Sequence, residues 1–301
     1  MRKKLVFCFL IIAFLVSNIN SQQRTYLKNY LPIDAVTSEN IFFNRKNINP
    51  SLSNDTITIK ASFFAHYQWL GLTNSPRNYS FSCTGKIPKT ASIIGMDLVY
   101  SGSSMFKNQT LKINHSYKIN LNNKSNLKIG TNLGVSRFKD YPVVNILSGA
   151  LNARVPNWIF RPNLDIGLTY NRLSQNIGIS YLNLFKSYIK HNSYQYVITD
   201  NILIVNYFSS YKLFNSIKIL PELIIFNESH KTNFVIKGIL SFHDKLQTGL
   251  FISNSLNDVG LVINSVIFKY FEIGYLFEIN KDELHKYTFG SHTLKLGIII
   301  N

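Results

Sequence analysis

Apolar and polar residues alternate along most of this chain with a period of two, in runs of about ten residues. Residues 127–136 show the pattern well, because lysine, glycine, asparagine and serine oppose a face formed by Leu127, Ile129, Leu133 and Val135. Successive side chains of a β-strand point to opposite faces. The alternation therefore predicts strands with one apolar face, and no sustained helical periodicity competes with it.

The chain contains fourteen such runs. They cover residues 57–68, 77–87, 91–101, 108–119, 126–137, 163–171, 175–183, 202–212, 216–226, 232–243, 245–255, 258–267, 269–279 and 290–301. An even number of antiparallel strands can close into a barrel, which leaves no unpaired edge.

A soluble β-sandwich would also alternate, with its apolar face turned inward. Two features favour a membrane barrel. The runs are longer than the usual globular strand of five or six residues and suit a tilted crossing of a bilayer. Their polar faces carry few charges, and Tyr and Phe gather near the run ends, as an aromatic girdle requires. We therefore predict an all-β protein: a closed antiparallel transmembrane β-barrel of about 14 strands, of the outer-membrane type.

The strand assignment is less well defined in three segments. Residues 185–212 could hide or lack a strand, and Pro221 weakens the ninth run because proline cannot donate a ladder hydrogen bond. Residues 138–162, which contain three prolines, form the longest expected loop.

The N-terminus predicts export and a three-part organisation. Arg2, Lys3 and Lys4 precede an apolar stretch from Leu5 to Val16, which is typical of a signal peptide and too short for a membrane-spanning helix. We assign residues 1–21 to this signal peptide and 57–301 to the barrel. Residues 22–56 have no strong pattern and are interpreted as a plug or a periplasmic-side lead-in.

The composition of the chain limits the classes of function that it can have. Charged residues make up 16% of the chain, below the roughly 25% typical of soluble domains. The net charge of +17 is spread out, with no basic run beyond the triplet at residues 2–4, so we expect no nucleic-acid partner. Cys8 lies in the signal peptide, so Cys83 alone remains and no intramolecular disulfide is expected.

Local catalytic and metal-binding motifs are missing from the sequence. No two of the seven histidines lie three to five positions apart, and glycine-rich phosphate loops and the G-x-S-x-G motif are missing. The sequence therefore predicts no enzyme, no catalytic residue, no metal and no cofactor. Four acids fall on predicted polar faces, where carboxylates facing the lumen are favoured over a catalytic pair: Asp97, Asp165, Glu272 and Glu278.

One turn stands out because it holds one of the two tryptophans. Trp69 sits among Gly71, Asn74 and Pro76, between the first two runs. It is interpreted as an aromatic residue of the membrane interface, with contact to a partner or to the plug as the alternative.

Several short motifs follow one another along the chain. Residues 49–52 are Asn-Pro-Ser-Leu, and residues 68–77 contain Gln-Trp-Leu-Gly and Ser-Pro-Arg. Residues 127–134 begin with Leu-x-x-Gly, residues 162–167 begin with Pro-Asn, and residues 290–297 begin with Gly-Ser-His. In this order the motifs resemble the Asn-Pro-Ala-x segment, the Gln-Trp-x-Gly…Ala-Pro-Lys hairpin, the Leu-x-x-Gly and Pro-Asn strands and the closing Gly-Ser-His strand of the PorP/SprF family of type IX secretion system outer-membrane proteins from Bacteroidetes. The resemblance spans about residues 40–301.

Some positions depart from the family pattern. His66 stands where the family has arginine before Gln-Trp, and Thr293 stands where an acid is common. Ser53-Asn54 replaces the glycine that usually follows the Asn-Pro segment, and the chain ends in Ile-Asn rather than in an aromatic residue.

The resemblance implies a non-enzymatic barrel in the outer membrane, in contact with its lipid. Core family members join periplasmic ring or peptidoglycan-linked parts of the secretion machine, and others support export or surface attachment of a large secreted adhesin. The candidate residues for partner contact carry the family motifs: Asn49, Pro50, Gln68, Trp69, Gly71, Pro76, Gly290, Ser291 and His292. The alternative function is a porin or a transport barrel for hydrophobic solutes, and a barrel enzyme is a minor third.

Overall fold

The computed structural model describes residues 37–53, 57–103, 106–140, 158–185, 187–191, 194–199, 201–228, 231–254, 258–280 and 286–300. All of them belong to one compact unit, residues 32–301. The predicted signal peptide, residues 22–36 and most of the long loop at 138–162 lie outside the described residues.

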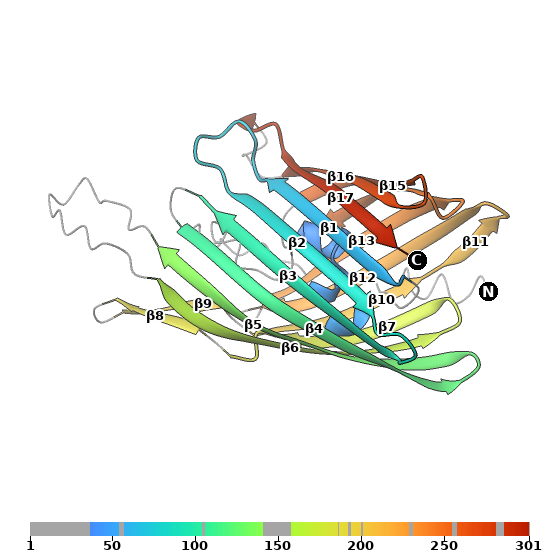
Figure 1. The fold of residues 1–301 in the computed structure, drawn as a ribbon. Helices are drawn as coiled ribbons and strands as arrows, with labels where there is room; N and C mark the ends of the chain where they lie inside the picture. Colours follow the sequence, from blue (N-terminus) through green and yellow to red (C-terminus); the bar gives the residue numbers. More distant parts are fainter. Residues whose placement is uncertain are drawn as a thin grey trace, which may run out of the picture. The chain divides into compact units, whose positions relative to one another are not determined.

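Seventeen strands make up most of the described chain (Figure 1). Their bounds are β1 Ile59–Tyr67, β2 Arg77–Lys86, β3 Ser92–Gly102, β4 Phe106–Asn122, β5 Ser125–Asp140, β6 Ile159–Arg172, β7 Gln175–Leu182, β8 Ser187–His191, β9 Tyr194–Thr199, β10 Ile202–Ser209, β11 Tyr211–Phe214, β12 Ile217–Glu228, β13 Lys231–Phe242, β14 Leu246–Ser253, β15 Asp258–Ile267, β16 Phe271–Asn280 and β17 Ser291–Ile300.

Fourteen strands close into an antiparallel barrel, which confirms the predicted fold class. Each strand pairs with the next along the chain, except that β7 pairs with β10 and β10 with β12. The pairing of β1 with β17 joins the two ends of the sheet. The short β11 continues along β12 after a break at Ser210, and β8 and β9 form a separate hairpin between β7 and β10.

The ninth predicted run forms β12 without interruption at Pro221. On one side Pro221 is in register with Gly238 of β13. On the other side it lies between Ile219, which pairs with β11, and Glu222, which pairs with β10. Proline has no N–H to donate, and Pro221 faces the break between β10 and β11. The hydrogen-bond ladder is already interrupted at that point.

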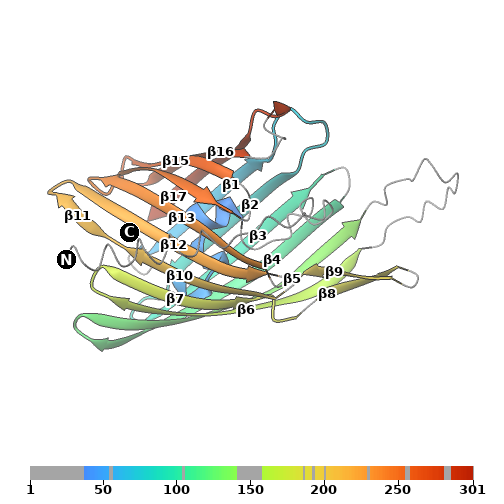
Figure 2. The same cartoon turned by 180° about the vertical axis from the view of Figure 1, so that it is seen from behind.

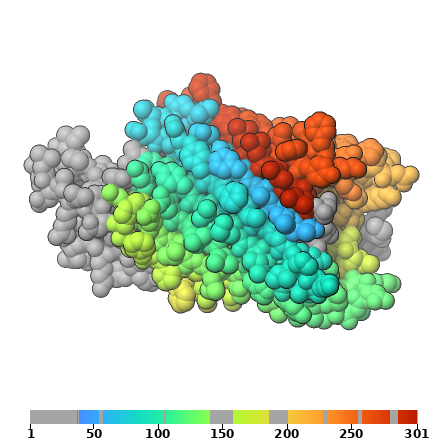
Figure 3. All heavy atoms as spheres, viewed as in Figure 1, coloured from blue at the N-terminus to red at the C-terminus, as the bar shows by residue number. Residues whose placement is uncertain are grey.

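The apolar faces of the strands point outward and the polar faces point inward. In β17, Leu294 and Leu296 are 52% and 58% exposed, whereas Thr293 and Lys295 are 0% and 2% exposed. A soluble sandwich would show the reverse, so this arrangement distinguishes a barrel surrounded by lipid. Figure 3 shows the side chains of β1 to β5 forming a continuous outer wall.

The two ends of the barrel differ in their connections. At one end, called the turn end, strands are joined by tight turns at residues 123–124, 173–174 and 215–216, among others. At the other, called the loop end, lie the connections at 68–76 and 183–201 and the one before β17. Outer-membrane barrels have short periplasmic turns and longer extracellular loops, so we assign the loop end to the cell exterior.

The lumen contains part of the chain itself. Residues 37–53, called the plug segment, comprise α2 (Ser38–Phe42), η2 (Arg45–Asn47) and η3 (Pro50–Leu52). Figures 1 and 2 view the barrel from opposite sides, and both show this blue segment within the ring of strands. Ile41 and Ile48 of the plug segment belong to a buried apolar cluster with inward side chains that include Ile224, Val235, Phe251 and Leu276.

Among the described helices, none has the length and apolar character needed to cross a membrane.

Candidate functional site

Asn49 holds the plug segment against the barrel wall. Its side-chain oxygen accepts a hydrogen bond from the backbone N–H of Ser51 at 3.1 Å and so caps the short helix η3. Its Nδ2 lies 3.0 Å from Oδ1 of Asn206 on β10 and 3.3 Å from Oγ1 of Thr169 on β6. Asn49 is completely buried. A buried amide with these partners fixes both the conformation of the plug segment and its place in the lumen.

Glycines on the inner wall make room for this contact. A Cβ at Gly130 would lie 2.3 Å from the carbonyl carbon of Pro50, and one at Gly167 would lie 2.1 Å from Oδ1 of Asn49. A Cβ at Gly178 would lie 2.7 Å from Nδ2 of Asn49. These distances are below van der Waals contact. Strand β5 therefore needs glycine where the backbone of the plug segment approaches it, and β6 and β7 need glycine where the Asn49 side chain approaches them.

Two carboxylates of the wall anchor the charged side chains of η2. Lys46 Nζ lies 3.0 Å from Asp97 of β3, which also accepts a hydrogen bond from Asn44. Arg45 lies 3.0 Å from Glu222 of β12. All but Arg45 are buried, and buried charges persist only when they are paired. The plug segment therefore completes the charge balance of the wall.

Lys237 links the second anchor to α2. Its Nζ lies 2.5 Å from Glu222 and donates a hydrogen bond of 2.9 Å to the carbonyl oxygen of Ile41. The same ammonium lies 4.6 Å from the centre of the Phe42 ring. One wall lysine thus contacts a carboxylate, a helix carbonyl and an aromatic face.

Glu39 is a buried acid of α2 that hydrogen-bonds to Ser80 of β2. Burial raises the pKa of its carboxyl group to about 7, and the nearby Asp97 carboxylate adds to the rise, while the hydrogen bond from Ser80 opposes it. A substantial fraction of Glu39 is therefore neutral at pH 7, and its burial costs less than that of a full charge.

Two further ion-pair clusters lie within the wall. Lys60 and Lys295 contact Glu272 at 2.7 and 2.5 Å, and Lys112 contacts Asp165 at 2.9 Å. The sequence placed Asp97, Asp165, Glu272 and Glu278 on the inner face, and the structure finds all four there, buried. The first three each pair with lysine.

Most of the motif residues at the loop end come together. The backbone N–H of Trp69 donates to Oγ of Ser291 at 3.1 Å, and that of Leu70 donates to the carbonyl of Gly290 at 2.8 Å. Gly71 and Gly290 have φ values of +102° and +84°, which favour glycine. The first hairpin and the last strand are therefore joined where the barrel closes.

The remaining motif residues make contacts elsewhere in the barrel and in the plug segment. His292 bonds Tyr275 on β16 through Nδ1 at 2.7 Å. Gln68 N–H donates to the carbonyl of Pro76 at 3.0 Å and closes the first hairpin. Asn49 and Pro50 lie apart from this group, in the plug segment. The nine residues thus form two structural groups, and their contact with a partner stays a prediction.

His66 and Thr293 lie opposite each other on β1 and β17. Their side chains are 2.8 Å apart, between Nδ1 and Oγ1, and both are buried. The family pattern has arginine at the first position and often an acid at the second. The two positions that depart from the family pattern are therefore in direct contact with each other.

Sequence reasoning missed the residues that seat the plug segment. Gly130 and Gly167 belong to the family-like strands at residues 127–134 and 162–167, and Gly178 lies on a predicted polar face, but none of these patterns indicates what the glycines contact. Lys237 and Glu222 lie in no motif. A glycine on an otherwise polar face can signal close backbone approach, but the approaching segment is far away in the sequence.

Comparison with known proteins finds one matching family. Residues 33–298 match the family described as type IX secretion system membrane protein PorP/SprF. No curated protein sequence matches the chain.

Several solved structures are similar to the chain at low sequence identity. The CymD monoaromatic hydrocarbon channel is 8% identical, with a TM-score of 0.50 over 88% of this chain and 92% of that chain. The outer membrane protein Omp33 of Acinetobacter baumannii is 9% identical, with a TM-score of 0.48 over 81% and 98% of the two chains. The P. putida toluene transporter TodX is 9% identical, with a TM-score of 0.47 over 83% and 91%.

Proposed function

The chain belongs to the PorP/SprF family of type IX secretion system membrane proteins, and from this premise we propose that it is a non-enzymatic barrel that binds protein partners. Its location is the outer membrane. The proposed role is to support export or surface attachment of a large secreted adhesin, or to dock the periplasmic ring complex of the secretion machine.

The observation that carries this proposal is the occupied lumen. The plug segment is held by Asn49, by two ion pairs and by three glycines of the wall. A lumen filled by buried, paired groups favours a partner-binding barrel over an open pore. The porin or hydrophobic-solute alternative requires that the plug segment move.

Exposed aromatic residues at each end supply candidate contact surfaces. At the loop end, Tyr287 and Phe289 are 70% and 76% exposed, next to the Trp69–Gly290 junction. At the turn end, Phe268 is 81% exposed in the turn between β15 and β16. Aromatic residues are enriched at protein interfaces, and exposed apolar groups beyond the lipid-facing wall favour a partner.

The test is surface display of the proteins secreted by the type IX system, in particular of any large adhesin encoded beside this gene. Deleting the gene is expected to abolish display, and the wild-type gene is expected to restore it. A Tyr287→Ser/Phe289→Ser variant should lose display if the adhesin docks at the loop end, with Phe268→Ser as the matched control at the other end. Loss with Phe268→Ser alone would favour periplasmic docking. Normal display of every type IX cargo in the deletion strain would contradict the proposal.

A further inference from the structure

The outer wall formed by β1 to β6 is layered from the loop end downward. In the uppermost row, Arg77 of β2, Lys107 of β4 and Lys139 of β5 lie across from one another through Gly102 of β3. All three are basic. This row lies at the loop-end limits of these strands.

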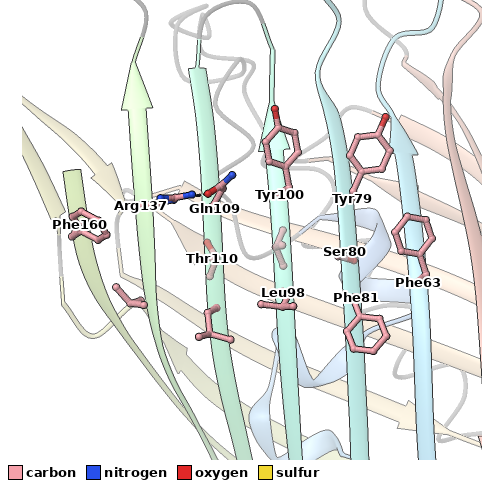
Figure 4. Close-up of a pocket in the computed structure, with 13 residues that line it drawn as sticks. Phe63, Tyr79, Ser80, Phe81, Leu98, Tyr100, Gln109, Thr110, Arg137 and Phe160 are labelled. Carbon is pink, nitrogen blue, oxygen red and sulfur yellow. Dashed lines mark hydrogen bonds between the residues drawn. The ribbon is translucent and has the colours of Figure 1, made fainter. Parts of the chain in front are cut away.

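The second row is amphipathic. Register places Tyr79, Tyr100, Gln109, Arg137 and Phe160 side by side on five consecutive strands. Figure 4 shows the hydroxyl groups of both tyrosines pointing toward the loop end and Arg137 hydrogen-bonded to Gln109. Tyrosine at this level is typical of a membrane interface, where the ring is in lipid and the hydroxyl meets water.

The third row is entirely apolar. It contains Phe63, Phe81, Leu98, Leu111 and Val135, again on five consecutive strands. Together the second and third rows line a shallow outer groove of about 470 Å³, a size found for small-ligand sites (Figure 4). The groove is therefore apolar below and polar above, with cations beyond it.

The basic row is not continued by the outward strand positions described on the other side of the barrel, where the exposed Lys286 lies in the connection before β17. At the loop end of β12 to β17, the described outward positions are polar or apolar and carry no lysine or arginine: Asn227, Thr232, Ile252, Val259, Ile279 and His292. A general interface belt would be similar all round. The cations and the groove coincide on one wall, which indicates a local anionic ligand with an apolar part.

We propose that this groove binds a phosphate-bearing lipid of the leaflet at the loop end. The acyl chain lies over Phe81, Leu98 and Leu111, and the phosphate meets Arg137 and the basic row above it. Guanidinium groups bind phosphate in a bidentate manner, and Arg77 and Arg137 are exposed for that contact. The opposite wall offers the same apolar contact without the charge.

The experiment measures lipid retention by the purified full chain in detergent, by native mass spectrometry. The probes are bisphosphorylated lipid A and the same lipid after enzymatic dephosphorylation. Wild-type protein should retain the phosphorylated probe preferentially. Arg77→Gln and Arg137→Gln should each weaken its binding roughly fivefold, because each basic residue near an anionic surface contributes about that factor. Lys86→Gln, which removes a cation from the turn end of β2, is the matched control and should bind as wild type.

A second variant separates lipid from free phosphate. Val135→Trp fills the apolar part of the groove without changing charge and should weaken binding of both lipid probes. Full displacement by millimolar inorganic phosphate, together with no effect of Val135→Trp, would indicate an ion site and overturn the proposal. Equal retention of the two probes by wild-type protein would also overturn it, and that comparison does not depend on any variant folding.

Discussion

At the residue scale, two positions at which this chain departs from the family pattern contact each other. His66 and Thr293 lie more than two hundred positions apart in the sequence, yet their side chains share one hydrogen bond in the wall. A buried ion pair that loses one partner leaves an uncompensated charge, whereas joint replacement by a neutral pair leaves none. The hydrogen bond between the two side chains lies in the seam between β1 and β17, so a change at either position alters the surroundings of the other.

This contact predicts the outcome of introducing a charged pair at the two positions. His66→Arg and Thr293→Glu should each lower the free energy of unfolding by about 3 kcal/mol, because each buries an unpaired charge. The double variant should recover most of that loss. The measurement is urea unfolding in detergent micelles. If the double variant is as unstable as the sum of the two single variants, the positions are not coupled.

At the scale of elements, the plug segment and the strands that face it are fitted to each other. Asn49 and Pro50 pack where β5, β6 and β7 carry glycine, and η2 supplies cations where β3 and β12 supply carboxylates. The plug segment has little regular structure of its own: one helix of five residues and two short 3-10 turns. Such short helices are not stable alone, so the wall determines their conformation.

Glycine substitutions test this fit. Gly130→Ala should lower the free energy of unfolding by about 1–3 kcal/mol, since its Cβ meets backbone atoms of the plug segment that cannot move independently. Gly238→Ala on β13 is the matched control, because a Cβ there meets nothing within 4 Å, and it should change stability by less than about 0.5 kcal/mol. Equal unfolding midpoints for the two variants would show that the plug segment does not press against β5.

For the whole molecule, the central property is a closed ring whose lumen is occupied. The apolar side of the lumen, lined by β10 and β12 to β16, receives Ile41 and Ile48, and the charged anchors lie around it. Removing the plug segment would leave Asp97 without its lysine and would expose the buried apolar cluster. The filled state is therefore favoured by both hydrophobic burial and charge pairing.

Ion conductance in planar bilayers measures this property. Wild-type protein should conduct weakly, and an Arg45→Ala/Lys46→Ala variant should conduct several times more, because both anchors of η2 are lost. Lys60→Met is the control: it removes a wall cation whose ion pair is with Glu272, a residue of the wall rather than of the plug segment. Strong conductance by the wild-type protein would support the transport alternative.

Local sequence was sufficient to define the strands and the faces they present. Alternation with a period of two located all fourteen barrel strands, because it reflects a local constraint: one side of every strand meets lipid and the other does not. The inward position of Asp97, Asp165 and Glu272 followed from the same rule. The family motifs at residues 68–77 and 290–297 could also be recognised from the sequence, because each is continuous in the chain.

Contacts between distant segments required the folded barrel. The seating of Asn49 between β6 and β10, the pairing of Lys46 with Asp97 and the meeting of His66 with Thr293 join residues that alternation treats independently. Ring closure brings β1 beside β17 and encloses the plug segment, and only then do particular glycines, lysines and acids acquire partners. Strand position is a local property, whereas the choice of partner across a lumen depends on how the whole sheet closes.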